Sequence, residues 1–251
     1  MAGRADAVTV PAKAFQQWLH RAAGDTSTAA VCRLAGIKKS TLAQQLVRGR
    51  VALATVVAVS RALGLDVVES ISTFEKYRDV AAGMRPPTEA ELLSQIADLD
   101  LLREIVSRSE AAATGVEAHP PQLLPVPHRT SVRAWIDAVG PADLRQQLAR
   151  DAGVAPQNLS AQITANRLTP DLAVRAARIA GVGLANGLVV TGLVRPLEAA
   201  WPSGARIKVL LALPNSTLLG VAAERLDAAS KTLRRTEQDN TRTQTIWENL
   251  A

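Results

Sequence analysis

An internal repeat limits the possible folds of this chain more than any other feature of the sequence. When the sequence is shifted by 117 residues, a stretch that begins FQQWLHRAAG at Phe15 aligns without a gap to one that begins VRAWIDAVGP at Val132. The identical pairs are Trp18/Trp135, Arg33/Arg150, Ala35/Ala152, Gly36/Gly153, Leu42/Leu159, Gln45/Gln162, Arg50/Arg167, Val57/Val174, Arg61/Arg178 and Gly64/Gly181. Apolar positions between these pairs also match, so the sequence predicts two copies of one folded unit.

The residues of each copy favour helices. Alanine, leucine and arginine dominate the chain, and only 3% of its 251 residues are aromatic. In the first copy, apolar residues at helical spacing predict helices over about 11–23, from a cap at 26–28 to 35, from 39 onward, and over 53–63 and 67–80. Gly36 and Gly64 end two of these helices, because glycine tolerates the left-handed conformation. We therefore expect an all-α fold with two tandem helix-turn-helix domains, each followed by an amphipathic helix.

Breaks in the helical pattern divide the chain into six predicted segments. A second, weaker repeat follows each copy, with leucines at helical spacing from Thr88 to Arg108 and from Asn215 to Arg235. Four prolines within 111–130 favour an extended, semi-stiff linker. The segments are a first helix-turn-helix domain (11–85), an amphipathic helix (86–113), a Pro-rich linker (114–131), a second helix-turn-helix domain (132–202), a C-terminal helical segment (203–235) and a polar tail (236–251), in which Ile246, Trp247 and Leu250 are candidates for docking.

The formal net charge of +6 is unevenly distributed along the chain. Residues 11–65 contain eight basic residues and one aspartate, and residues 132–195 contain seven arginines and four aspartates. Between these blocks, residues 86–131 contain three arginines and seven acidic residues. Two basic blocks separated by an acidic one indicate two surfaces that face a polyanion. Ordinary variation of surface charge explains the same numbers, so charge alone does not decide.

Three motifs make the interpretation more specific. The first copy contains TLAQQLVRGR at 41–50 and VVAVSRALG at 56–64, and the second contains NGLVVTGLV at 186–194. These stretches resemble the lambda-repressor-like helix-turn-helix superfamily, and more closely the immunity repressors of actinobacterial phages and prophages. The resemblance covers about 15–80 and 132–197. It implies sequence-specific binding to double-stranded DNA and repression of transcription, with the unit duplicated in tandem.

The third helix of the first copy is the predicted reading helix. If Leu42 and Leu46 face the core, then Ala43, Gln44 and Val47 face outward together with Lys39 and Ser40. Gln44 suits adenine, lysine suits guanine or a phosphate, and basic residues at the helix ends suit phosphates. The candidate DNA-binding residues of this copy are Lys38, Lys39, Ser40, Thr41, Gln44, Arg48 and Arg50. The alternative interpretation is a solvated helix face without a partner.

The second copy presents different side chains at the equivalent helix. Its candidate residues are Gln157, Asn158, Ser160, Ala161, Thr164 and Arg167, and the helix contains no lysine. Amides and hydroxyls can read bases, but fewer phosphates would be neutralised. Two possibilities stay open: this copy reads a different sequence, giving an asymmetric operator, or it is a scaffold for docking or dimerisation. We favour the first. Arg61 and Arg178, which recur at equivalent positions, either hold phosphates or form ion pairs.

We predict no catalytic residues, no metal site and no cofactor. Catalytic sets at recognisable spacing, phosphate-binding glycine loops and paired histidines are missing from the sequence. Cys32 is interpreted as a small buried filler. We also find no Ser–Lys self-cleavage domain. Without an apolar run of 18 residues or a signal peptide, the expected location is the bacterial cytoplasm, in association with the nucleoid.

The predicted partner is operator DNA, bound in the major groove by a monomer that acts as a pseudo-dimer, or by a homodimer. The helices near 88–108 and 216–235 pack against their own domains, against each other, or across a true dimer. Two other functions stay open. One is an antitoxin-type or other protein-interaction regulator in which only the first unit binds DNA. The other is an architectural DNA binder with little sequence preference.

Overall fold

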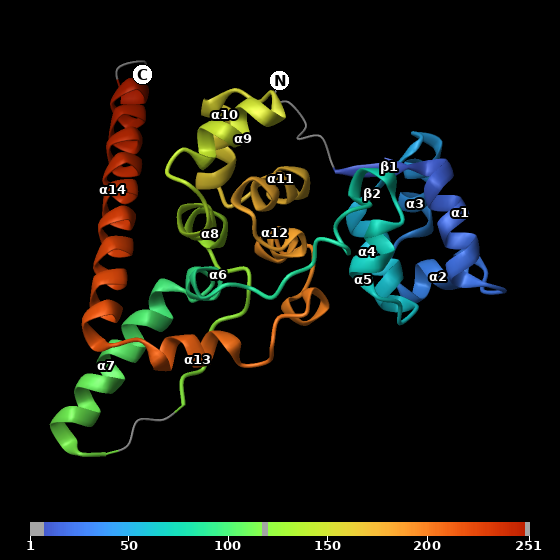
Figure 1. Cartoon of the computed structure of the whole chain (residues 1–251). Helices are drawn as coiled ribbons and strands as arrows, with labels where there is room; N and C mark the ends of the chain where they lie inside the picture. The colour runs from blue at the N-terminus through green and yellow to red at the C-terminus, as the bar shows by residue number, and fades with distance from the viewer. Residues whose placement is uncertain (1–7, 117–119, 249–251) are drawn as a thin grey trace. The chain divides into compact units, whose positions relative to one another are not determined.

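A computed structural model describes residues 8–116 and 120–248, with side chains as far as residue 243. The described residues form fourteen α-helices, two short 3-10 helices and one two-stranded sheet (Figure 1). The prediction of a helical fold is confirmed. The side chains of Ile246, Trp247 and Leu250, which we considered for docking, lie outside the described residues.

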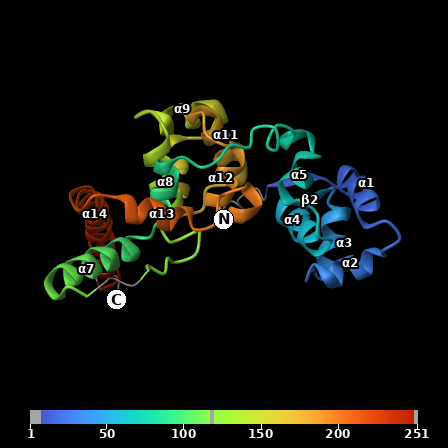
Figure 2. The ribbon, with the colours of Figure 1, turned by 60° about the horizontal axis from the view of Figure 1, so that its bottom comes forward.

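The first copy of the repeat folds into five helices. These are α1 (Ala12–Ala23), α2 (Thr28–Leu34), α3 (Lys39–Val47), α4 (Leu53–Ala62) and α5 (Val67–Ser72), which form one group in both ribbon views (Figures 1 and 2). Phe15 and Trp18 on α1 are buried, and Trp18 stacks at a tilt against Phe74, with 5.9 Å between ring centroids. The fifth helix was predicted to reach residue 80. It ends at Ser72, and a 3-10 turn η1 (Glu75–Tyr77) follows.

The second copy has the same five helices in the same order. They are α8 (Ser131–Val139), α9 (Leu144–Ala152), α10 (Pro156–Thr164), α11 (Pro170–Ala180) and α12 (Leu184–Val190). The last three begin 117 residues after α3, α4 and α5 respectively. Gly153 and Gly181 adopt positive φ angles of 64° and 70°, as Gly36 and Gly64 do in the first copy. The helices and turns therefore repeat with the period found in the sequence.

A small sheet distinguishes the first copy from the second and was not predicted. Strand β1 (Thr9–Pro11) pairs antiparallel with β2 (Arg50–Ala52), so that Val10 lies opposite the buried Val51. The sheet follows Gly49, whose positive φ of 72° turns the chain out of α3. Three-residue strands leave no alternating pattern long enough to recognise in the sequence.

In the second copy, Asn166 stands where Gly49 does and uses its side chain instead of a strand. Its φ is 53°, in the left-handed region that asparagine tolerates better than most residues. Its Oδ1 accepts from the backbone N–H of Val132 at 2.9 Å, and its Nδ2 donates to the carbonyl oxygen of His128 at 3.0 Å. One asparagine therefore fixes the start of α8. The side chain of Thr130, the N-cap residue, makes no capping hydrogen bond there.

The predicted amphipathic helix at 86–113 is two helices, α6 (Glu89–Ser94) and α7 (Asp98–Thr114). The break allows α6 to pack on α8, where Glu91 is fully buried. The Glu91 carboxylate accepts from Trp135 Nε1 and Asn186 Nδ2, both at 3.1 Å, and from the backbone N–H of Thr88 at 2.9 Å. Trp201 Nε1 in turn donates to Asn186 Oδ1 at 2.8 Å. The helix α6 is thus part of the core of the second copy.

The chain forms two compact units whose boundaries differ from the predicted segments. Both copies of the repeat and α6 lie in the first unit, residues 1–95 and 125–205. The second unit comprises residues 96–124 and 206–251, with α7 packed against α14 (Asn215–Glu248). Between the end of α7 at Thr114 and the start of α8 at Ser131, the described part of the predicted linker contains no regular helix or strand. Residues 236–248, predicted as a polar tail, continue α14.

Arginines hold the second unit together. Arg108 on α7 donates to the carbonyl oxygens of Leu210 and Leu213 at 2.8 and 2.6 Å, at the end of α13 (Ala205–Ala212). Arg225 on α14 donates to the carbonyl oxygen of Ile96 at 2.5 Å. Burial lowers the pKa of Arg225, with Asp98 acting in the opposite direction.

No single helix in the described ranges has both the length and the apolar composition needed to cross a membrane. The helices α13 and α14 meet that test only as a pair, which is bent by 110°.

Candidate nucleic-acid interface

The helix α3 is held from its inner face, so its orientation is fixed. Leu42 is buried on that face. The side chain of Gln45 crosses to the start of α4, where its Oε1 accepts from the backbone N–H of Ala52 at 2.9 Å and from the hydroxyl of Thr55 at 3.2 Å. Because Ala52 is the N-cap residue of α4, this glutamine ties α3 to the start of α4. Sequence reasoning noted Gln45 only as an identical position and missed this role.

All seven candidate DNA-binding residues of the first copy are exposed in the structure. They lie at the start of α3, along its outer face and in the turn that follows it: Lys38, Lys39, Ser40, Thr41, Gln44, Arg48 and Arg50. Ala43 and Val47 are exposed beside them. The sequence prediction that Leu42 and Leu46 face inward is correct for the buried Leu42, while Leu46 is half-buried. The outer face of α3 therefore has no partner within the first copy.

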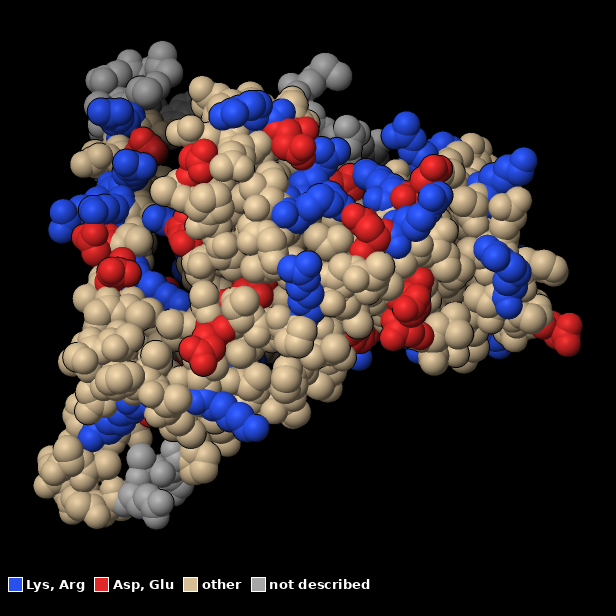
Figure 3. Space-filling view, viewed as in Figure 1, with Lys and Arg blue, Asp and Glu red and all other residues tan. Residues whose placement is uncertain are grey.

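The basic residues around α3 form a group at the two ends of one helix. Within the described residues, no carboxylate lies within 4.0 Å of Lys38, Lys39, Arg48 or Arg50. Elsewhere basic side chains are often paired, and over much of the face drawn in Figure 3 Lys and Arg lie next to Asp and Glu. Four uncompensated charges at the ends of one exposed helix form a local site that attracts polyanions.

The equivalent helix α10 is also exposed but carries little free charge. Gln157, Asn158, Ser160, Ala161, Thr164 and Arg167 are all exposed. The helix α10 itself contains no lysine or arginine, and elsewhere in the second copy Arg145 pairs with Asp137 and Arg175 pairs with Asp151. Within the described ranges, the inner face of α10 lacks the hydrogen bonds that Gln45 forms on the inner face of α3. Gln162 Oε1 is buried with no partner in the described structure, and Leu172 stands where Thr55 donates to Gln45.

The repeated arginines Arg61 and Arg178 form ion pairs between the two copies. Of the two roles left open above, phosphate binding and ion pairing, this favours ion pairing. Arg61 donates through Nε and Nη2 to Glu198 at 2.6 and 2.7 Å, and through Nη2 to the carbonyl oxygen of Leu193 at 3.1 Å. Arg178 of the second copy pairs with Asp79 of the first copy. Each arginine lies on the fourth helix of its copy and reaches the segment after the fifth helix of the other. Such reciprocal contacts are typical of a two-fold interface, here within one chain.

A further contact between the copies is formed by Lys76 and Tyr77, which both donate to the carboxylate of Asp171. Tyr77 is buried, and burial together with the hydrogen bond to Asp171 raises its pKa above the usual range of tyrosine. The raised pKa favours the protonated hydroxyl, which is the form that donates to Asp171. These contacts hold α3 and α10 in one compact unit.

Acidification should weaken the Arg61–Glu198 pair. Burial alone would raise the pKa of Glu198, but hydrogen bonds from Arg61 and from the backbone N–H of Arg195 outweigh it and lower the pKa below 4.5. Because the folded-state pKa is depressed, the stabilisation is fully present above the unfolded-state pKa and is lost as the pH falls through the folded-state value. We expect wild type to lose about 1 kcal/mol more than Glu198→Gln between pH 6 and pH 3, measured by urea unfolding. Parallel losses in both proteins would contradict the assignment.

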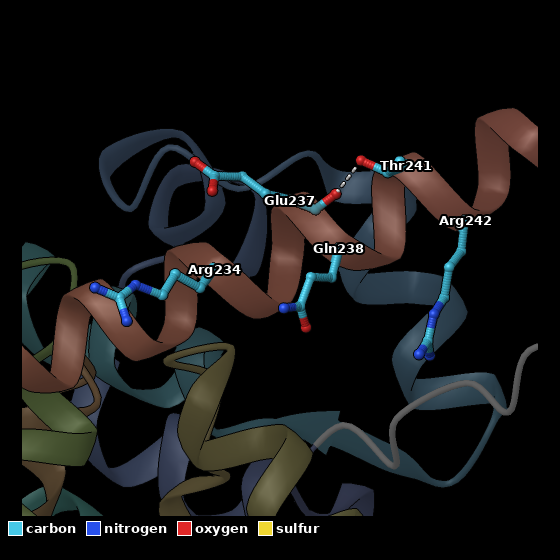
Figure 4. Close-up of a pocket in the computed structure, with 5 residues that line it drawn as sticks. All are labelled: Arg234, Glu237, Gln238, Thr241 and Arg242. Atoms are coloured by element: carbon cyan, nitrogen blue, oxygen red, sulfur yellow. Dashed lines mark hydrogen bonds between the residues drawn. The ribbon is translucent and has the colours of Figure 1, made fainter.

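One shallow hollow on the second unit does not resemble a binding site. It is lined by Arg234, Glu237, Gln238, Thr241 and Arg242, and all five residues belong to α14 (Figure 4). Thr241 donates to the carbonyl oxygen of Glu237 at 2.9 Å, an ordinary contact within one helix. Binding pockets normally gather polar groups from several elements. The described residues also contain no group of three His, Cys, Asp or Glu side chains placed to hold a metal ion.

Comparisons with protein-family models, with curated proteins and with solved structures found no match for this chain.

Proposed function

We propose that this chain binds double-stranded DNA through α3 and α10 and represses transcription by occupying an operator, as an immunity repressor of a phage or prophage does. The observation that carries the proposal is the outer face of α3. It presents exposed polar side chains between four basic residues that lack carboxylate partners. A helix lying in the major groove needs such a face, with polar groups for base edges and cations for the phosphates on either side.

In this proposal the position of each side chain on α3 determines whether it contacts a base or a phosphate. Gln44, in the middle of the exposed face, offers the donor and acceptor pair that reads adenine. Lys38 at the N-terminus of the helix and Arg48 and Arg50 beyond its end contact phosphates, together with the backbone N–H groups of the first turn. Lys39 and Ser40 lie between these regions, and each has access to a base edge or to a phosphate.

The second copy would read a different half of the site through α10. Its amides and hydroxyls, from Gln157 to Thr164, suit base edges, and Arg167 suits a phosphate at the place equivalent to Arg50. Since the two outer faces differ, the preferred operator would be asymmetric. One chain would act as a pseudo-dimer, because its two reading helices are already joined by the chain and by the reciprocal arginine contacts.

A second candidate is a regulator in which only the first copy binds DNA. It is favoured by the composition of α10, which contains no lysine or arginine. Phosphate neutralisation supplies much of the affinity of DNA-binding proteins, so a copy without it binds weakly by itself.

Selection of bound DNA from a random library, with the purified full-length protein at fixed salt, tests both candidates. We expect a long asymmetric consensus, with Gln44→Ala relaxing one part by about 1–3 kcal/mol of discrimination and Gln157→Ala relaxing the other part. Gln16→Ala, an exposed glutamine on α1, is the control and should leave the consensus unchanged.

A consensus that is insensitive to Gln157→Ala would support the second candidate. Failure to enrich any motif, with equal affinity for all duplexes, would contradict sequence-specific repression and leave an architectural binder.

A further inference from the structure

The side chain of Val47 is unusually exposed for its type. It is 88% exposed, the largest value among the large apolar side chains in the described ranges. It is the last residue of α3, directly before Arg48. An exposed valine on a helix gains nothing in stability over alanine, because valine has the lower helix propensity and buries no surface here. The stability of the fold therefore does not explain why valine occupies this position.

The position of Val47 relates it to the proposed reading face. Successive residues of an α-helix are separated by about 100°, so Ser40, Ala43, Gln44 and Val47 lie within an arc of about 100°. Val47 lies near the centre of that arc. Its neighbours along the arc are polar or small, and all are exposed. A single branched apolar group thus stands on a polar face that is bordered by four unpaired cations.

The equivalent position in the second copy has the same shape. Thr164 occupies the place of Val47 on α10 and is also exposed. Threonine and valine are both branched at Cβ, and each presents a γ-methyl group at this position. The two helices differ at most other outer positions, including Gln44, which is replaced by Ala161. A branched methyl near the centre of the outer face is therefore a feature that both copies have.

We infer that Val47 is a specificity-determining residue that contacts the 5-methyl group of thymine in the major groove. This inference rests on the proposed function. Thymine is the base that presents an apolar group in the major groove, and small apolar side chains read it by contact. The cations on either side of the helix supply the charge complementarity that directs this face to DNA rather than to an apolar protein surface.

The test removes the proposed contact from each partner in turn, first the 5-methyl group of thymine and then the γ-methyl groups of Val47. Each thymine of the selected operator is replaced by deoxyuridine, and the dissociation constant is measured at fixed salt for wild type, Val47→Ala and Val47→Thr. For wild type we expect one or two positions at which deoxyuridine weakens binding by about three- to tenfold. Val47→Ala should lose a similar factor on the unmodified operator and no longer distinguish thymine from deoxyuridine there. Val47→Thr keeps one of the two γ-methyl groups and should retain the discrimination.

Val106→Ala, the same change at an exposed valine of α7 in the second unit, is the control and should behave as wild type. Circular dichroism of the Val47 variants should match wild type, since the residue is exposed. The inference is overturned if Val47→Ala keeps full discrimination at every thymine, or if wild type shows none while still selecting a specific operator. If no operator is selected at all, the proposed function fails and this inference fails with it.

Discussion

Removal of the Glu91 carboxylate is expected to lower the free energy of unfolding of the first unit by about 2–6 kcal/mol. Glu91 is fully buried, and its carboxylate accepts from the indole of Trp135 and the amide of Asn186. In Glu91→Ala both donors remain buried without their acceptor, at a cost of about 1–3 kcal/mol each. The capping box of α6 is lost as well, because Glu91 also accepts from the backbone N–H of Thr88. Urea unfolding monitored by tryptophan fluorescence measures the change.

Two further variants make this test specific to the carboxylate. Glu91→Gln keeps one acceptor oxygen but turns an amide N–H₂ group toward a donor, so we expect an intermediate loss. Glu89→Ala removes an exposed carboxylate two residues earlier on the same helix and should change stability by less than about 0.5 kcal/mol. A loss for Glu91→Ala no larger than for Glu89→Ala would show that the buried network contributes little.

Replacement of Lys38, Lys39, Arg48 and Arg50 by alanine should weaken operator binding by about a hundred- to ten-thousandfold at low salt. Each of these side chains is exposed and lacks a carboxylate partner in the described structure. If each neutralises one phosphate, the slope of log K against log salt should become shallower by about 3 to 4. Arg167→Ala in the second copy should change the slope by about 1. Fluorescence anisotropy over a salt titration measures both quantities.

A control of equal charge separates a local site from a general effect of net charge. Lys208, Arg234, Arg235 and Arg242 of the second unit are exposed and also without a carboxylate within salt-bridge distance in the described structure. Their replacement by alanine removes the same four charges and should change affinity by less than about tenfold. Equal effects of the two quadruple variants would contradict an interface centred on α3.

The helices were predictable because they depend on local patterns that survive in both copies. Leucines at helical spacing and glycines at the turns marked α3, α4 and α5, and the same signals recur at α10, α11 and α12. The outer face of α3 was predictable for the same reason, since the positions of Leu42 and Leu46 indicate which side chains face away from the core. All the residues proposed for DNA contact are exposed.

The features that sequence reasoning missed depend on distant partners. The helix predicted at 86–113 is interrupted after Ser94, and Glu91 on its first part accepts from donors on α8 and α12, which lie far along the chain. Arg61 and Arg178 had two possible roles until the structure placed Glu198 and Asp79 beside them. Periodicity and charge counts describe one element at a time, so they carry no information about such contacts.

The presence of both copies in one chain, joined also by the contacts of Arg61 and Arg178, has a consequence for gene dosage. A regulator built from two separate single-copy chains must first associate, so at low concentration its active form increases with the square of the amount of protein. Here α3 and α10, the two proposed reading helices, are joined from synthesis onward because they belong to one chain. Occupancy of the proposed operator by one chain would then rise in direct proportion to concentration, and halving the concentration of the protein would halve, rather than quarter, the active species. Such a regulator maintains its response at low copy number.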